Sequence, residues 1–177
     1  LNKALTSKVF ELQKYRSEFF GKLQSILGDR KDIKIVGDRF IFESELLFDS
    51  ASADLQLSGK EKLSEIGLTL KETTNDIPSD IDWIIMVEGH TDNVPYKSGG
   101  VLQDNWDLSA MRATSITRIL QHRFGVKPSR LIAAGRSSYV PLGPNDSNAN
   151  RSKNRRTKII ILPKLGQFFE LLEEKAE

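Results

Sequence analysis

The sequence of 177 residues contains no cysteine, which excludes disulfide bonds and thiolate metal sites. It has only two histidines, His90 and His122, too few for a histidine-rich metal site. No hydrophobic run approaches the length that spans a bilayer. The formal net charge is only +2, so the charge balance gives no reason to expect a nucleic-acid-binding protein. None of these absences fixes the compartment.

The sequence also lacks the short motifs that mark many catalytic sites. It has no glycine-rich phosphate loop, no G-x-S-x-G elbow and no H-E-x-x-H pair. Its composition, 38% hydrophobic and 28% charged, is typical of a globular domain, and its length suits one domain with a flanking element. Nothing in the sequence therefore argues for catalysis, and we expect no cofactor.

Residues 1–29 are predicted to form a helix. Its apolar residues follow alternating spacings of three and four, interrupted by Arg16: Leu5, Val9, Leu12, Phe19, Leu23 and Ile26. This spacing indicates either the end of a coiled coil or a helix that packs on its own domain, and the sequence does not separate the two. Because the chain begins at Leu1, we expect it to be a fragment or a processed form.

The middle of the chain alternates strand and helix signals. Two short strands flank the turn Gly37-Asp38, and a capping box from Ser58 to Glu61 predicts the start of a helix with Ser58 as N-cap. The next helix is predicted over Asp107–Phe124, with Asp107 as N-cap and Gly125 after its end. The predicted strands are Trp83–Val87, which we expect to be covered on both faces, Leu131–Ala134 and Thr157–Leu162.

This order predicts an α/β fold (an α+β sandwich), β-α-β-α-β-β, with helices on one side of a mixed sheet. We divide the chain into an N-terminal helix (1–29), the domain itself (30–163) and a short amphipathic C-terminal helix (164–177). Residues 137–153 are predicted to be a long loop without regular structure, which is more often functional than idle.

The predicted helix Asp107–Phe124 carries an arginine on its apolar side. At about 100° per residue, one arc collects Leu108, Ile119, Ile116, Leu120 and Ala113. Arg112 falls inside that arc, where a guanidinium is costly unless an anionic group meets it. Asp92, at the end of the preceding strand, can supply that charge in a structural ion pair. Alternatively, the two charges bind a ligand that carries both an ammonium and a carboxylate.

Glu88, His90 and Asp92 alternate along a strand end and can share one face. Such a trio permits a metal or general-base site, but no second histidine and no further ligand pattern lies nearby. We expect no metal there, and we expect His90 to form hydrogen bonds that shape the loop. His122 is expected to face solvent.

The strongest charge run is Arg151–Lys158, RSKNRRTK. The simplest interpretation is a solvated loop that leads into an edge strand. A nucleic-acid surface needs aromatic side chains for stacking, and the run holds none. Contact with an anionic polymer or with ligand carboxylates fits the run better, so we expect no nucleic-acid partner.

Four motifs occur in a fixed order: Phe48–Ala53 (FDSASA), Gly89–Asp92 (GHTD), Asn105–Ser109 (NWDLS) with Arg112-Ala113, and Asn154–Arg156 (NRR). Over about 40–162 the chain thereby resembles the OmpA-like family of peptidoglycan-binding domains. The long loop that ends in Asn105-Trp106 looks more like the flagellar stator B branch than the short-looped lipoprotein branch. Lys158 departs from the pattern, because relatives often have an acid there, and we expect it to alter a surface contact.

The resemblance implies a non-enzymatic domain in the periplasm that anchors a membrane-attached protein to peptidoglycan. By motif match, Asp92 would hold the ammonium and Arg112 the carboxylate of meso-diaminopimelate in the stem peptide. Thr91, Asn105, Asn154 and Arg155 would line the same pocket. The resemblance further implies a homodimer and an inner-membrane anchor upstream of this chain.

Three alternatives stay open beside a simple anchor. The first is a stator-type subunit of an ion-driven motor or defence complex that is anchored to the wall. The second is a peptidoglycan hydrolase that uses Glu88, His90 and Asp92. The third and weakest is a nucleic-acid binder that uses the run Arg151–Lys158.

Overall fold

The computed structural model describes residues 3, 6–7, 9–11, 13–14, 17, 33–36, 39–43, 47–49, 51–75, 83–97 and 100–163. The elements are β1 (Ile33–Val36), β2 (Arg39–Glu43), α2 (Leu57–Asn75), β3 (Trp83–His90), α3 (Asn105–Phe124), the 3-10 helix η2 (Pro128–Arg130), β4 (Leu131–Gly135), α4 (Asn148–Asn154) and β5 (Arg156–Pro163). Among the described residues, no helix combines the length and apolar character needed to cross a bilayer.

The described residues between Lys3 and Ser17 are helical. The rest of the predicted N-terminal helix and the predicted C-terminal helix, 164–177, lie outside the described residues. The coiled coil and the division at residues 29 and 163 therefore stay predictions.

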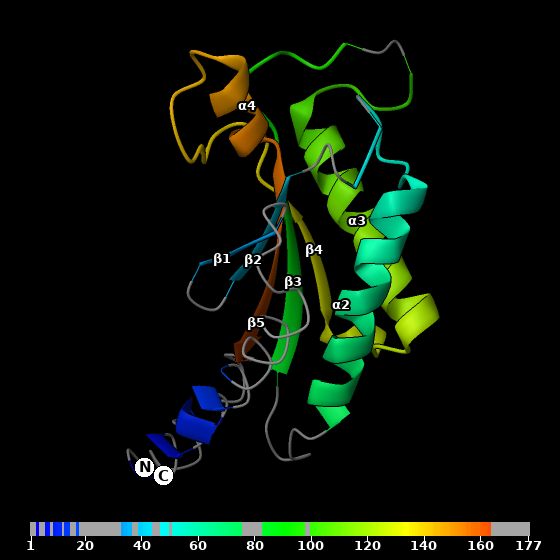
Figure 1. The fold of residues 1–177 in the computed structure, drawn as a ribbon, viewed down its shortest axis with the longest axis vertical. Helices are drawn as coiled ribbons and strands as arrows, with labels where there is room; N and C mark the ends of the chain where they lie inside the picture. Colours follow the sequence, from blue (N-terminus) through cyan, green and yellow to red (C-terminus); the bar gives the residue numbers. More distant parts are fainter. Residues whose placement is uncertain are drawn as a thin grey trace, which may run out of the picture.

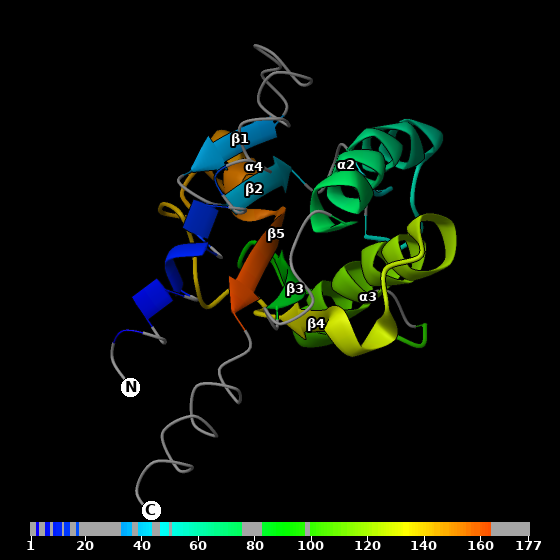
Figure 2. The same ribbon diagram turned by 90° about the horizontal axis from the view of Figure 1, so that it is seen from below.

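The strands form one mixed sheet in the order β1-β2-β5-β3-β4. β3 and β4 are parallel, and the other neighbouring strands are antiparallel. Helices α2 and α3 lie together on one face of the sheet (Figures 1 and 2). The predicted fold class is thus confirmed. The interpretation of the last strand as an edge strand is wrong, because β5 lies between β2 and β3.

The core lies between the two helices and the sheet. The spacing of Leu63, Ile66, Gly67 and Leu70 predicts one apolar face for α2, and its three large side chains are fully buried. Gly67 lets the Phe124 ring approach so closely that a Cβ would lie 2.3 Å from it. The apolar arc of α3 is buried in the same cluster. On β3, Ile85 and Val87 are buried beneath the helices, but alternate residues are only half-buried. The expectation that this strand is covered on both faces is therefore wrong for its outer face.

Both helices begin earlier than the sequence predicts. α2 starts at Leu57, so Ser58 is already helical and is not the N-cap. The reason is tertiary: the Gln56 N–H donates to Leu47 O at 2.9 Å, and Gln56 O already accepts from Lys60 N. A Cβ on Gly59 would lie 2.6 Å from Leu47 O, so glycine permits this close start.

In α3 the N-cap is Asp104, whose carboxylate accepts from the N–H groups of Trp106 and Asp107. Asp107, predicted to be the cap, lies instead in the first turn and accepts from Gln103 N at 2.8 Å. The end of α3 is as predicted, with Gly125 in the left-handed region at φ 70°.

The long loop predicted over 137–153 is partly wrong, because Asn148–Asn154 form the helix α4. Ser147 caps it by accepting from Asn150 N at 3.2 Å. A polar helix of seven residues, about two turns, has no apolar periodicity, so the hydrophobic pattern gives no signal for it.

Candidate functional site

The candidate site lies at the rim where β3 and β4 end and β5 begins. Gly89 pairs with Gly135 in the parallel register, and His90 pairs with Arg156 in the antiparallel one. The segments that follow β3 and β4 are joined by a hydrogen bond from Thr91 N to Ser137 O at 2.9 Å. Residues that are far apart in sequence therefore meet at one end of the sheet.

Asp92 is the buried acid of this rim, with 7% of its surface exposed. Its Oδ1 accepts from Val94 N at 3.0 Å, and its Oδ2 lies 2.5 Å from Arg155 Nη1. The Thr91 hydroxyl donates to Asp92 O at 2.9 Å, and the Asn105 amide donates to the same oxygen at 3.4 Å. The structure thus brings together four of the six predicted site residues: Thr91, Asp92, Asn105 and Arg155.

Arg112 is held by a different part of the chain. Its side chain is 4% exposed, and its Nε donates to Ser52 O at 2.8 Å and its Nη2 to Asp49 O at 3.4 Å. Its guanidinium carbon lies 5.2 Å above the Phe48 ring. The ion pair that the structure gives Asp92 is with Arg155, so Arg112 binds the 48–53 segment to α3 instead.

The 48–53 segment needs this support. Ala51 adopts φ 51°, in the left-handed region that costs a non-glycine residue roughly 1 kcal/mol or more. Besides Arg112, the Ser115 hydroxyl of α3 donates to Ala53 O at 2.8 Å. The FDSASA motif is therefore fixed to the helix by two side chains of α3.

Asn154, the sixth predicted site residue, is fully buried. Its Oδ1 accepts from Leu142 N at 2.8 Å and Gly143 N at 3.3 Å. Its Nδ2 donates to Gly143 O and to Asn145 Oδ1. The amide is therefore used within the loop before α4, and it braces that loop, which leaves Arg155 facing Asp92.

Glu88 and His90 form a separate charged group on the outer face of the sheet. Glu88 Oε1 lies 2.8 Å from His90 Nε2 and 3.2 Å from Lys158 Nζ. The hydrogen bond from His90 and the neighbouring positive charges lower the pKa of Glu88 from 4.5 to about 2, against the opposing effect of burial. Burial lowers the pKa of His90 from its ordinary 6.5. A carboxylate held ionised in this way is poorly suited to act as a general acid. Among the described residues, no group of three or more acidic, histidine or cysteine side chains can hold a metal ion.

The basic run is not a solvated loop. Arg156 is 1% exposed, and its guanidinium donates to Asn154 O and Val140 O. Burial lowers the pKa of Arg156 to about 10. Lys158 is 7% exposed and paired with Glu88, so it makes an interior contact and not the predicted surface contact. The run therefore offers no continuous basic face for a nucleic acid.

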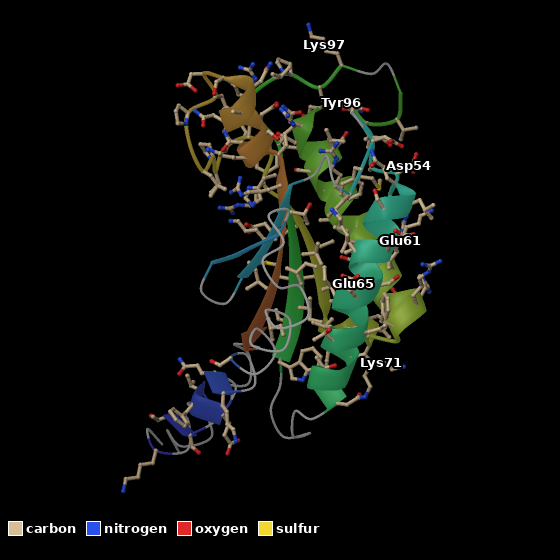
Figure 3. The ribbon with its side chains drawn as sticks, viewed as in Figure 1. Asp54, Glu61, Glu65, Lys71, Tyr96 and Lys97 are labelled. Carbon is tan, nitrogen blue, oxygen red and sulfur yellow. The ribbon has the colours of Figure 1, made fainter. Side chains whose placement is uncertain are left out.

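A cleft of about 250 Å³ opens at the same rim, and its lining includes Asn93, the residue after Asp92. It is lined by Asn93, Pro95, Tyr96, Asp104, Asn105, Trp106, Ser137, Ser138 and Tyr139. Figure 3 shows Tyr96 on the loop beyond the N-terminal end of α3. The rings of Trp106 and Tyr139 lie with centroids 5.5 Å apart at an angle of 31°.

Of the predicted site residues, only Asn105 lines this cleft. The pairing of Trp106 with Tyr139 is not predicted from the sequence, where the two are separated by a helix and a strand. The signal that could have found it is the parallel arrangement of β3 and β4, which places the segments after both strands at one rim.

The sequence matches the OmpA family over residues 47–155. Motility protein B of Bacillus subtilis (strain 168) is 35% identical over 108 residues, which cover 60% of this chain and 41% of that protein. Motility protein B of Helicobacter pylori (strain J99 / ATCC 700824) is 31% identical over 122 residues, which cover 67% of this chain and 43% of that protein. The chain thus spans less than half the length of these relatives.

Solved structures also show similarity to MotB proteins. The crystal structure of a MotB-like protein from Desulfovibrio vulgaris superposes with a TM-score of 0.67 at 26% identity, and covers 92% of this chain and 96% of that one. The periplasmic domain of Helicobacter pylori MotB (residues 97–256) superposes with a TM-score of 0.63 at 25% identity, over 82% of this chain and 99% of that one.

Proposed function

Since the chain belongs to the OmpA family of non-enzymatic, peptidoglycan-binding domains, we propose that it grips the wall through meso-diaminopimelate of the stem peptide. In this way it anchors a membrane-attached protein to the cell wall. The similarity to the periplasmic domain of MotB supports a periplasmic location. The homodimer and the inner-membrane segment upstream are part of the same proposal.

The observation that carries this proposal is the environment of Asp92. A carboxylate that is 7% exposed is costly to bury, and here it is fixed by a backbone N–H and a guanidinium. It lies next to Asn93, which lines the cleft. A fixed anion beside an open cleft is suited to an ammonium group, because the ligand need not organise the site. The ligand ammonium would either bind Asp92 together with Arg155 or take the place of Arg155 at the carboxylate.

Arg112 has two candidate roles in this proposal. The motif match assigns it the ligand carboxylate, and its hydrogen bonds to Ser52 O and Asp49 O assign it the support of the 48–53 segment. The planar guanidinium can do both, because it offers five N–H donors. Thr91 and Asn105 act on the backbone of Asp92, so we assign them to holding the acid in place.

The similarity to motility protein B favours a second candidate, a stator-type subunit whose wall anchor is this domain. The hydrolase alternative has no support from the site. Glu88 is held ionised by His90 and Lys158, and Asp92 is paired with Arg155.

The test is co-sedimentation of the purified chain with isolated sacculi, with free meso-diaminopimelate as competitor. We expect Asp92→Ala to weaken binding by about 2–5 kcal/mol, because it leaves the ligand ammonium without its counter-charge. Glu61→Ala, which removes an exposed acid on α2, is the matched control and should bind like wild type. Undiminished binding by Asp92→Ala, or binding that the free amino acid does not displace, would refute the diaminopimelate mechanism.

A further inference from the structure

We propose that Trp106 and Tyr139 form a stacking platform for a pyranose ring of the peptidoglycan glycan strand, beside the Asp92 site. This inference rests on the proposed function and extends it from the stem peptide to the sugar. The domain would then bind the peptide part and the sugar part of the polymer at the same time.

The first support is the exposure of the two rings. Trp106 is 49% exposed and Tyr139 72% exposed, although each ring could bury a large apolar area. The rings lie against one another and both line the cleft. One ring comes from the first turn of α3 and the other from the segment after β4, and neighbouring exposed aromatic rings at a cleft are typical of a binding site.

The second support is the way the two rings are held. The buried Ser109 hydroxyl donates to Trp106 O at 3.0 Å and accepts from Ser137 N at 3.0 Å. Ser137, two residues before Tyr139, adopts φ 48°, a left-handed conformation that costs a serine free energy. One side chain of α3 therefore fixes both segments that carry the rings.

The third support is the close packing beneath Ser109. A Cβ on Gly89 would lie 2.2 Å from Ser109 O, and a Cβ on Gly135 would lie 2.7 Å from Ser109 Oγ. Glycine at the ends of β3 and β4 thus lets α3 approach close enough for Ser109 to form its hydrogen bonds with Trp106 O and Ser137 N. The platform is positioned by the fold and not by flexible side chains alone.

The chemistry of the cleft fits a sugar. A pyranose has a flat face of C–H groups that stacks on an aromatic ring, and a rim of hydroxyl groups that needs donors and acceptors. The cleft supplies the rings together with the side-chain amides of Asn93 and Asn105 and the hydroxyl of Ser138. In a polymer of sugars and short peptides that contain diaminopimelate, alanine and glutamate, the flat apolar faces belong to the sugars.

The two proposed parts of the site are also adjacent. The Asn105 amide donates to Asp92 O and to Val94 O at 2.9 Å, and Asn105 itself lines the cleft. The proposed ammonium site and the platform thus share one residue. We therefore place the sugar and the stem peptide of one ligand at neighbouring parts of this rim.

The experiment compares three probes by isothermal titration calorimetry: free meso-diaminopimelate, the peptide-free disaccharide of N-acetylglucosamine and N-acetylmuramic acid, and the disaccharide carrying its stem peptide. In the variant Trp106→Leu with Tyr139→Leu we expect about tenfold or greater loss of affinity for both sugar probes, and less than about twofold change for diaminopimelate. Trp106→Phe with Tyr139→Phe keeps both rings and should restore most of the affinity. Phe10→Ala removes an exposed ring (69%) that does not line the cleft, and should change nothing.

A fluorescence measurement gives a second readout. Trp83 is 6% exposed and Trp106 49%, so an emission change on adding the disaccharide reports Trp106. Equal affinity of the Leu variant and wild type for the sugar probes, with matching thermal unfolding curves, overturns the platform. Failure of the proposed function looks different: wild type then does not bind free diaminopimelate, and diaminopimelate does not displace it from sacculi, whether or not the disaccharide binds.

Discussion

Arg155 Nη1 lies 2.5 Å from Asp92 Oδ2, and this contact joins the end of β3 to the residue before β5 across 63 positions of sequence. The Asp92 side chain is 9% exposed and the Arg155 side chain 26%. Removing one partner of an ion pair so shielded from water costs more than removing one partner of a surface pair, because the other charge is left without compensation. The pair also gives the proposed ligand ammonium a competitor already in place.

The first prediction concerns this pair. In a double-mutant cycle of Asp92→Asn and Arg155→Gln, urea unfolding should give a coupling energy of about 1–2 kcal/mol. The control cycle pairs Asp92→Asn with Arg151→Gln, because Arg151 donates to Asn145 O and Asn148 and not to the aspartate. A coupling no larger than in the control cycle would mean that the pair contributes nothing to folding.

The second prediction concerns Arg112. Arg112→Ala should lower the free energy of unfolding by about 2–4 kcal/mol, because it removes the hydrogen bonds to the 48–53 segment and leaves a cavity over Phe48. Arg112→Lys should recover part of this loss, since lysine keeps a charge but not the planar fork.

Arg118→Ala is the matched control for Arg112, because it removes an exposed arginine from the same helix. It should cost no more than about 0.5 kcal/mol. Equal unfolding midpoints for Arg112→Ala and Arg118→Ala would show that Arg112 does not support the fold. Any loss of sacculus binding in Arg112→Ala could then be assigned to direct ligand contact.

The third prediction tests the close approach of α3 to the sheet. Gly89→Ala should destabilise the fold by about 3 kcal/mol or more, because its Cβ would lie 2.2 Å from the backbone oxygen of Ser109 and neither backbone can yield easily. Gly143→Ala, where a Cβ meets nothing within 4 Å, is the control and should stay close to wild type. Thermal unfolding followed by circular dichroism measures both. A wild-type melting temperature for Gly89→Ala would contradict the packing.

The parts of the fold that the sequence predicts are those encoded by local periodicity. The faces of α2 and α3, the apolar strand β3 and the end of α3 at Gly125 all follow from residues within a few positions of each other. The two predicted helix starts are wrong for different reasons: the hydrogen bond from Gln56 N to Leu47 O extends α2 beyond its capping box, and in α3 the cap is Asp104, three residues before the predicted Asp107.

The site was harder to predict because its contacts are distant in sequence. Charge and periodicity correctly marked Asp92 and Arg112 as unusual, but no local pattern indicates that Asp92 is paired with Arg155. Tyr139 reaches Trp106 only through the parallel register of β3 and β4 and the turn at Ser137. The burial of Arg156 and Lys158 likewise follows from the central place of β5, which the composition of the charge run does not reveal.

The fourth prediction is a loss of stability in acid that begins near neutral pH. Burial lowers the pKa of His90 in the folded state from its ordinary 6.5. Below pH 6.5 His90 therefore binds a proton more readily in the unfolded chain than in the folded one. As a result, the free energy of unfolding falls as the pH falls. Glu88 acts in the same direction at lower pH: its pKa is lowered from 4.5 to about 2, so its contribution is present above pH 4.5 and is lost as the pH falls toward 2.

The two groups can be separated with variants measured by thermal unfolding from pH 8 to pH 3. His90→Gln keeps an amide that can donate to Glu88 but does not titrate, so its melting temperature should lose the decline below pH 6.5 that we expect for wild type. His122→Gln, at an exposed position of α3, should keep that decline. Glu88→Gln should flatten the curve below pH 4.5 and lower stability at pH 7, because Lys158 and His90 lose their anionic partner. An identical pH profile for His90→Gln and wild type would show that the buried histidine does not control acid stability.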